Sequence, residues 1–367
     1  MQTVIADETD PCHIIKGILR LRSLLLSASA LTAVTFAAAL TTPALAQDTA
    51  KIAPKVMVIT MFGQEAKPWA EGEKFTQQIK LAGLNPEYPN VDCTDEGLCH
   101  MTTAMGFANA ASSVSAMALS EKFDLSKTYF LIAGIAGVDP KRGTLGSAHW
   151  AKFAVDADLN HRIDQSEVPD TWETGSFALG ADNPTETAKW SAGTEVYALN
   201  AKLADYAFSV TKDVELLDGD GAKAYRKHYK GDIATGAPIV SMCDTLSSDT
   251  YWHGAKIAGF MEKWVELLTD GKGTYCTSQM EDNATLTALK RASEAGKLDF
   301  NRIALLRTAS NFDRQGEDQA ALESLKSESG GFKLATTNAY RVGKAYAQTI
   351  LTSWDKWQEA PQTETAK

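Results

Sequence analysis

The segment GTYCTSQMEDNATLTALKRASEAGKLDFNRIALLRTASNFDR, residues 273–314, decides the fold class of this chain. Met280 and Glu281 stand at the head of a helical pattern of apolar residues, and the apolar run 303–306 is typical of a strand. Three polar residues follow that run: Arg307, Ser310 and Asn311. A carboxylate, a guanidinium and an amide therefore gather where strands end, which is where open α/β sheets bind their ligands.

Further segments continue this alternation of strands and helices along the chain. Strand-like runs occur at 55–60, 129–138, 147–155 and 233–242. Helical patterns occur at 108–119, 185–210, 255–268 and 332–357, whereas residues 66–100 are polar and rich in turn signals. The pattern predicts a three-layer α/β/α sandwich, and no repeat or low-complexity linker divides it into further domains.

Composition and charge limit the classes of function. The chain has 367 residues, of which 44% are apolar and 22% charged, so it can bury a sizeable core. Its formal net charge is −10 and it has no basic tract. Nucleic acids and anionic membrane surfaces attract clustered Lys and Arg, so neither is expected as a partner.

The first part of the chain has the pattern of a signal peptide. Basic residues precede an apolar run, 24–40, and small residues occupy the cleavage positions 44–46. We therefore expect residues 1–46 to be removed and residues 47–367 to form a single secreted or periplasmic domain. An uncleaved membrane anchor is the alternative, although the run is short for a span. No later segment has an apolar run long enough to cross a bilayer.

Five cysteines are present, and Cys12 would leave with the signal peptide. The other four would enter an oxidising compartment, where three pairings are open to them. The short spacing of Cys93 and Cys99 favours their pairing, which leaves Cys243 with Cys276. Buried free thiols are the alternative.

Residues 156–167, DADLNHRIDQSE, imitate the ligand spacing of a calcium loop. However, His161 stands where such a loop needs glycine, and Pro169 interrupts the helix that should follow. We therefore predict an acidic surface loop, and no metal or cofactor.

Glu65 is the first of the candidate site residues that the pattern alone indicates. It follows the strand 55–60 and a glycine-containing turn, although a solvated glutamate in the first turn of a helix would look the same. Gly134 and Gly137 form a Gly-x-x-Gly turn at the end of the strand 129–138, where backbone can approach a ligand. Such turns also occur for steric reasons alone.

A second group of candidates follows the predicted strand 233–242. Asp244 stands at its exit, and Tyr251 and Trp252 follow in an aromatic turn. Aromatic side chains at this place are suitable walls for a planar ring. Packing in the core is the alternative for both rings.

Several ordered motifs resemble those of the purine nucleoside permease family, whose fold is that of the nucleoside phosphorylases and nucleosidases. The resemblance runs from about residue 55 to 357. The motifs are Thr103-Ala104-Met105-Gly106, Ala133-Gly134-Ile135-Ala136-Gly137-Val138, Gln279-Met280-Glu281 and Arg307-Thr308-Ala309-Ser310-Asn311. Gly106, in the first of them, is a further substrate-binding candidate.

The resemblance implies roles for five residues. Met280 and Glu281 would face a ribose, and Glu65 matches the carboxylate that handles the attacking water in nucleosidases. Arg307 would anchor this acidic region. Asn311 would meet the purine edge, where nucleosidases generally have Asp, and an amide suits a 6-oxopurine as well as adenine.

The resemblance also implies which functions to compare. Ile132 and Ile135 stand where bacterial phosphorylases hold phosphate with Arg and Ser, so hydrolysis ranks above phosphorolysis. A nucleoside-binding protein that serves uptake is the first expectation, and a purine nucleosidase is the alternative. A structural protein that kept the fold and lost the site is a third. By analogy we expect a homo-oligomer, and transport through an unidentified membrane partner.

Overall fold

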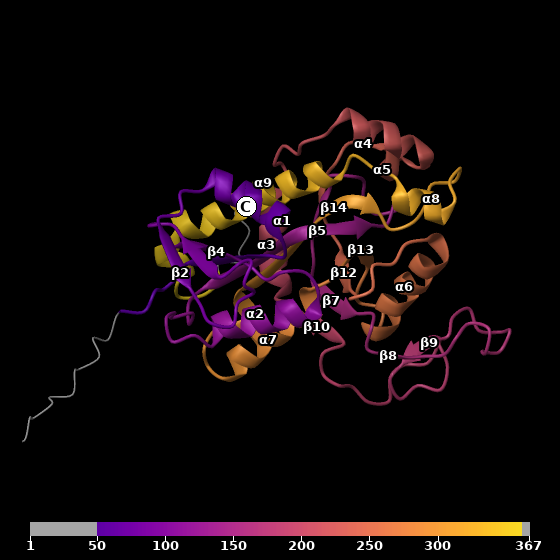
Figure 1. Cartoon of the computed structure of the whole chain (residues 1–367), viewed down its shortest axis with the longest axis horizontal. Coiled ribbons are helices and arrows are strands. Elements are labelled where there is room, and N and C mark those ends of the chain that lie inside the picture. Colours follow the sequence, from indigo (N-terminus) through magenta and orange to yellow (C-terminus); the bar gives the residue numbers. More distant parts are fainter. Residues whose placement is uncertain (1–49, 362–367) are drawn as a thin grey trace, which may run out of the picture. The chain divides into compact units, whose positions relative to one another are not determined.

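Three parallel strands form the centre of a twelve-stranded sheet: β1 (Val56–Thr60), β5 (Tyr129–Val138) and β14 (Ile303–Phe312). β5 lies between the other two and pairs with both in parallel. The computed structural model describes residues 50–361, so the predicted signal peptide lies outside the described residues. Residues 50–361 belong to one compact unit (Figure 1).

The other strands extend this centre in two directions. From β1 the sheet continues through β4 (Leu98–Thr102), β3 (Asn90–Cys93) and β2 (Gln77–Lys80). From β5 it continues through β13 (Tyr275–Gln279), β12 (Asp244–Ser247), β7 (Phe153–Asp156) and β10 (Val196–Ala198). β6 (Ala148–Trp150) pairs with β14 and with β11 (Val240–Met242), and β8 (Asn160–Arg162) pairs with β9 (Ser176–Ala178) in a separate small sheet.

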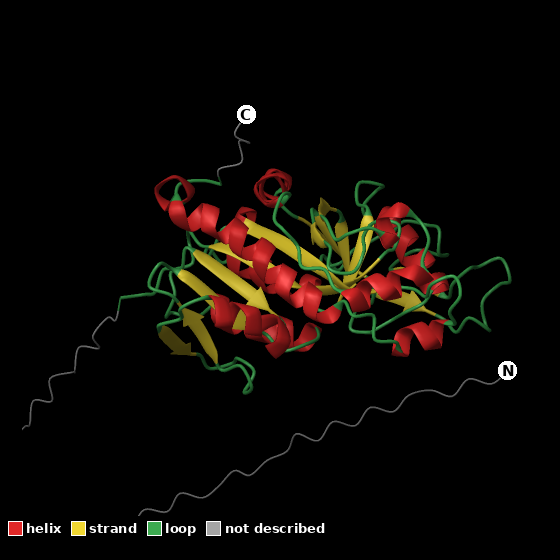
Figure 2. Cartoon of the chain, turned by 90° about the horizontal axis from the view of Figure 1, so that it is seen from above, coloured by secondary structure: helices red, strands yellow, loops and turns green. Residues whose placement is uncertain are grey.

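Helices cover both faces of the sheet, which confirms the predicted three layers (Figure 2). Met57 and Ile59 of β1 pack in one apolar cluster with α2 (Phe107–Ala118) and α7 (Asp282–Glu294). Val56 and Val58 point to the opposite face, in a cluster with α3 (Ala201–Thr211), α9 (Phe332–Thr352) and Trp69 of α1 (Gly63–Gly72). Because both faces are buried, the central strands are continuous apolar runs.

The remaining helices lie around this frame. α6 (Ala255–Leu268) has the bounds predicted from the sequence, and its Trp264 and Val265 are buried beside β7 and β12. The shorter helices are α4 (Asp220–Tyr225), α5 (Asp232–Thr235), α8 (Ala321–Lys326) and α10 (Trp354–Trp357), with 3₁₀ turns at Arg226–His228 and Phe300–Arg302. None of the helices among residues 50–361 is long and apolar enough to span a bilayer.

Three regions differ from the sequence prediction. Residues 66–100 contain β2, β3 and the start of β4. The sequence did not predict β2, because Ile79 is its only buried residue. Residues 185–195 are irregular, and the helix begins after Asn200, whose side chain accepts the N–H of Leu203 at 3.3 Å. In the predicted strand 233–242, the first part is α5 and only Val240–Met242 is extended.

The apparent calcium loop begins at the end of β7 and continues into β8. The Asp156 carboxylate accepts the N–H groups of Asp158 and Leu159 at 2.7 and 3.1 Å, so it stabilises the turn that begins at this residue. Asp156 is buried, so the prediction of a solvated loop is wrong at this residue. Asp158 is exposed and accepts the hydroxyl of Ser248 at 2.9 Å.

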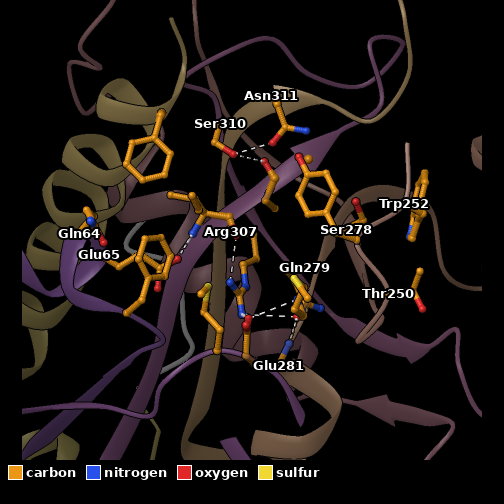
Figure 3. A pocket seen from close by; sticks show the side chains of 18 residues that line it. Gln64, Glu65, Thr250, Trp252, Ser278, Gln279, Glu281, Arg307, Ser310 and Asn311 are labelled. Carbon is orange, nitrogen blue, oxygen red and sulfur yellow. Dashed lines mark hydrogen bonds and ion pairs between the residues drawn. The ribbon is translucent and has the colours of Figure 1, made fainter. Parts of the chain in front are cut away.

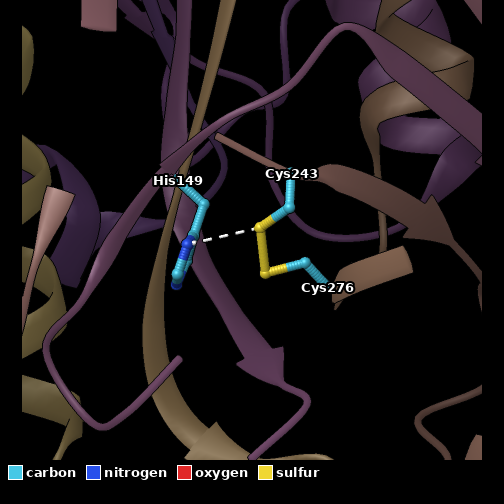
Figure 4. A group of neighbouring side chains, drawn as sticks. All are labelled: His149, Cys243 and Cys276. Atoms are coloured by element: carbon cyan, nitrogen blue, oxygen red, sulfur yellow. Dashed lines mark hydrogen bonds between the residues drawn. A yellow bond between two sulfur atoms is a disulfide. The ribbon is translucent and has the colours of Figure 1, made fainter. Parts of the chain in front are cut away.

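The structure contains two disulfides, and they are the pairings favoured by the sequence. Cys93 and Cys99 face each other on the antiparallel strands β3 and β4, with Cα atoms 4.1 Å apart. Cys243 and Cys276 link the start of β12 to β13, with Cα atoms 5.6 Å apart. His149 Nδ1 lies 3.4 Å from Cys243 Sγ (Figure 4). These three residues have metal-ligand atoms within 4.8 Å of one another, but the two sulfurs are joined and cannot bind a metal as thiolates.

Candidate functional site

A cavity of about 440 Å³ lies at the carboxyl ends of β5, β13 and β14, within the size range of small-molecule sites (Figure 3). It is lined by Phe62, Gln64, Glu65, Met105, Ile135, Ala136, Gly137, Thr250, Tyr251, Trp252, Ser278, Gln279, Met280, Glu281, Arg307, Ser310, Asn311 and Phe332. Glu65, Glu281 and Asn311, which are far apart along the sequence, therefore open onto one space. The structure brings together the three residues proposed for catalysis, Glu65, Glu281 and Arg307, and most of the predicted substrate-binding residues.

Glu281 is positioned by the turn from β13 to α7. Gln279 Oε1 accepts the N–H groups of Glu281 and Asp282 at 2.8 and 2.9 Å, which fixes this turn. The Glu281 carboxylate accepts the N–H of Gly106 at 3.2 Å. Burial raises the pKa of Glu281, and the charge of Arg307 opposes that shift. The Glu281 carboxylate can therefore still accept hydrogen bonds from a ligand in the cavity, while the backbone of its turn is fixed by Gln279.

Arg307 is oriented by contacts on three sides. Its Nη2 donates to Asp282 Oδ1 at 2.5 Å and its Nε donates to Asp282 Oδ2 at 3.1 Å. Its Nη1 donates to the carbonyl of Ile135 at 3.0 Å, and Nη2 also lies 3.5 Å from Glu281 Oε2. A buried guanidinium with such partners has few N–H groups left for a ligand. In the cavity Arg307 therefore mainly orients the carboxylates of Asp282 and Glu281 and balances their negative charge.

Glu65 lies in the first turn of α1 and reaches across to β5. Its Oε2 accepts the N–H of Met61 at 2.7 Å, and its Oε1 accepts the N–H of Ile135 at 2.6 Å. Burial raises the pKa of Glu65 from 4.5 to about 7, since loss of hydration outweighs the opposing charge of Arg307. A carboxyl group with this pKa can take up or release a proton near neutral pH.

Asn311 is turned toward the cavity by an irregularity of β14. The register with β5 shifts between Ala309 and Asn311, as at a β-bulge. Asn311 Oδ1 accepts the hydroxyl of Ser310 at 2.8 Å, and Nδ2 donates to the carbonyl of Phe312 at 3.0 Å. Because an amide has two donors and two acceptor lone pairs, one of each stays available to a ligand.

Aromatic rings form two further parts of the wall. Figure 3 shows Trp252 on the side of the cavity opposite Glu65. Tyr251 is 60% exposed, whereas Trp252 is 9% exposed and its ring centre lies 6.4 Å from that of Tyr275. Phe62 and Phe332 contribute a second aromatic pair, with ring centres 6.1 Å apart. These apolar surfaces suit a planar ring.

Three predicted substrate-binding residues do not line the cavity. Contrary to the prediction, Asp244 does not face the cavity. Its carboxylate accepts three backbone N–H groups, from residues 152, 153 and 274, at 2.7–2.9 Å, and so joins neighbouring segments. Gly106, with φ of 88°, acts through its N–H on Glu281. Gly134 and Gly137 lie within β5 rather than in a turn, and only Gly137 lines the cavity.

Several residues that form the site were not predicted from the sequence. Asp282 follows Glu281 directly, but only the fold shows that it is the main partner of Arg307. Gln279 belongs to a motif that the sequence singled out, yet its role in the turn depends on backbone geometry. Phe62 and Phe332 stand far apart along the chain and carry no local signal of a shared site.

The charges around the cavity favour some ligands over others. Glu65, Glu281 and the neighbouring Asp282 surround one cation, and Arg307 is the only Lys or Arg among the residues that line the cavity. This arrangement provides acceptors for hydroxyl groups and stabilises positive charge. Asp282 and the carbonyl of Ile135 already accept hydrogen bonds from this cation.

Solved structures with a similar fold are nucleosidases and related hydrolases. The futalosine hydrolase of Helicobacter pylori is 14% identical, with a TM-score of 0.52 and coverage of 81% of this chain and 98% of that chain. The 5'-methylthioadenosine/S-adenosylhomocysteine nucleosidase of Helicobacter pylori is also 14% identical, with a TM-score of 0.52 and coverage of 82% and 100%. At this identity the likeness shows the fold alone, and it agrees with the predicted fold class.

Relatives with higher identity are purine nucleoside permeases of fungi. A probable purine nucleoside permease of Schizosaccharomyces pombe is 39% identical over 317 residues, which cover 83% of this chain and 91% of the relative. A purine nucleoside permease of Candida albicans is 36% identical over 320 residues, which cover 86% and 79%. The family model for purine nucleoside permease matches residues 53–362. This chain therefore belongs to the purine nucleoside permease family.

Proposed function

We propose that this protein binds a purine nucleoside in the cavity and thereby serves nucleoside uptake. The ribose hydroxyls donate to Glu281, and the purine edge meets Asn311. The observation that supports this best is the convergence of Glu65, Glu281 and Asn311 on one cavity with aromatic walls. Membership of the permease family supports uptake as the process that binding serves.

Capture rather than conduction is the form of uptake that we propose. None of the described helices could cross a bilayer, so the nucleoside would be passed to a separate membrane component. Export of the chain belongs to the same proposal, and the two disulfides support it because such bonds persist in oxidising compartments. Labelling of free thiols in the protein taken from each cell fraction tests this part, since a reduced cytosolic form would contradict it.

A purine nucleosidase is the second candidate function, and Glu65 favours it. A buried carboxyl group with a pKa of about 7 is suited to accept a proton from water at neutral pH. The acidic surroundings would stabilise a ribosyl cation. Phosphorolysis has less support, since the only cation that lines the cavity is held by Asp282 and Ile135.

Calorimetry and a base-release assay separate these functions. Purified protein is mixed with adenosine, guanosine and inosine, with and without phosphate, and free base is measured. Tight binding with intact nucleoside supports capture, whereas release of base without phosphate supports hydrolysis. Absence of binding and of base release for every nucleoside would overturn both.

The variant Glu281→Gln tests the ribose contact. A hydrogen bond to a charged group is worth about 1.5–3 kcal/mol, so we expect affinity to fall roughly tenfold to a hundredfold. Glu121→Gln is the control, because Glu121 is exposed and pairs with Lys51 and Lys297. Equal affinity of the wild type and Glu281→Gln would show that the ribose lies elsewhere.

A further inference from the structure

A small, partly open space adjoins the main cavity at Asn311. Its volume is about 70 Å³, and Tyr251 and Asn311 line both spaces. Three serines also line it: Ser324, Ser327 and Ser329. We call this space the serine annex. At roughly 30 Å³ for each water molecule, it can hold an exocyclic group of a base together with a water.

The position of the annex connects it to the base rather than to the sugar. Asn311 is the residue that the proposed function assigns to the purine edge, and Glu281, assigned to the ribose, does not line the annex. Ser329 fixes the annex against β14, because its hydroxyl donates to the carbonyl of Ser310 at 2.9 Å. A base in contact with Asn311 would therefore direct its edge substituents into this space.

The hydroxyl protons of two serines are already used. Ser327 Oγ donates to the carbonyl of Glu323 at 2.8 Å. Ser329 Oγ donates to the carbonyl of Ser310 at 2.9 Å and accepts the N–H of Gly331 at 3.1 Å. A hydroxyl group has one proton and two lone pairs, so with these bonds in place Ser329 has one lone pair left for a ligand and Ser327 has two.

The third serine forms a fixed part of the wall. Ser324 Oγ lies 3.0 Å from the hydroxyl of Tyr225 and 3.1 Å from Nε2 of His253. Ser324 is buried, and Tyr225 and His253 line the same space. Its contacts stay within the wall, and the acceptors of Ser327 and Ser329 set the preference of the annex.

We propose that the serine annex selects purine nucleosides whose base carries an exocyclic amino group. This inference rests on the proposed function. An amino group donates to the acceptors of Ser327 and Ser329, while Asn311 contributes one free donor and one free acceptor to the ring edge. An oxo group there would face the lone pairs of Ser327 and Ser329. Inosine, which has an oxo group and no amino group, is therefore disfavoured.

Four nucleosides test the inference on the wild-type protein: adenosine, 2-aminopurine riboside, inosine and purine riboside, which has no exocyclic group. We expect at least one amino-bearing nucleoside to bind roughly tenfold more tightly than purine riboside, as one satisfied hydrogen bond predicts. Inosine should gain nothing over purine riboside. Inosine binding as tightly as the better amino nucleoside would overturn the inference.

The variant Ser327→Ala tests the residue assignment. It should reduce the preference for the amino nucleoside severalfold while leaving the affinity for purine riboside unchanged. Ser209→Ala is the matched control, because Ser209 also donates to a carbonyl of its own helix, that of Tyr206 at 2.7 Å, and lies in α3. An unchanged preference in Ser327→Ala would contradict the assignment. If no nucleoside binds the wild type, the proposed function fails; if all four bind equally, only the annex inference fails.

Discussion

Glu65 and Glu281 are the two glutamates among the residues that line the cavity. Both are buried carboxyl groups near Arg307, and burial raises the pKa of each. Glu281 lies 3.5 Å from the guanidinium and accepts the N–H groups of residues 106 and 280, and Glu65 accepts those of residues 61 and 135. With its pKa raised to about 7, Glu65 can exchange a proton near neutral pH.

The raised pKa of Glu65 predicts a pH dependence of stability. Between pH 4.5 and about 7 the folded state keeps a proton that the unfolded state has lost, so stability falls as pH rises through this window. A shift from 4.5 to about 7 corresponds to about 3 kcal/mol. We expect Glu65→Gln to lose this part of the decline, measured by denaturant unfolding at pH 5 and pH 8.

The control for this experiment is Glu71→Gln in the same helix. Glu71 is exposed and pairs with Lys67, so its replacement should leave the difference between the two pH values unchanged. Parallel pH profiles for the wild type and Glu65→Gln would show that Glu65 titrates normally.

At the scale of elements, the pairing of β5 with β14 assembles the acidic part of the site. Arg307 of β14 stands opposite Gly134 of β5 in the parallel register. The absence of a side chain at Gly134 leaves room for two groups, because a Cβ there would lie 2.5 Å from Arg307 Nη1 and 2.6 Å from Glu65 Oε1. The glycine is required for packing, not for an unusual backbone conformation.

Gly134→Ala should therefore disturb the site from within the sheet. The added methyl group must displace Arg307 or Glu65, and overpacking of this kind costs about 1–3 kcal/mol. We expect a lower free energy of unfolding and nucleoside affinity reduced by at least tenfold, measured by urea denaturation and calorimetry.

Gly259→Ala provides the comparison. Gly259 lies in α6, and a Cβ there would meet nothing within 4 Å. Alanine in place of a helical glycine stabilises by about 0.5–1 kcal/mol, so this variant should gain stability and keep its affinity. The same loss of stability in both variants would contradict the packing argument.

At the scale of the whole molecule, the two disulfides connect the sheet in different ways. Cys93 and Cys99 are six residues apart and join adjacent strands β3 and β4. Cys243 and Cys276 are separated by 33 residues, and this span contains α6. The longer loop restricts the unfolded chain more strongly.

Removal of each disulfide should reveal this difference. In the chain-entropy description, Cys243→Ser/Cys276→Ser loses about 4 kcal/mol and Cys93→Ser/Cys99→Ser about 2 kcal/mol. We expect the first double variant to have the lower melting temperature, measured by calorimetry without reductant. In the presence of a reductant the wild type should fall to or below both variants, and the reverse order of the variants would contradict the loop-length argument.

The sequence predicted those parts of the fold and site that depend on local pattern. The apolar run at 303–306 indicated β14, and the amphipathic segment 255–268 gave the bounds of α6. Short-range motifs also placed Glu65, Glu281 and Asn311 at strand ends. Strands such as β2, with one buried residue, have no comparable local signal.

The amino-acid sequence was therefore enough to predict the alternation of strands and helices, the family, and the residue types at the strand ends. Only the tertiary structure decided that Asp282 pairs with Arg307, that Asp244 binds backbone rather than ligand, and that serines of residues 324–329 stand behind Asn311. The physical reason is range: periodicity and turn chemistry act between near neighbours, whereas these contacts join residues that only the packed sheet brings within hydrogen-bonding distance.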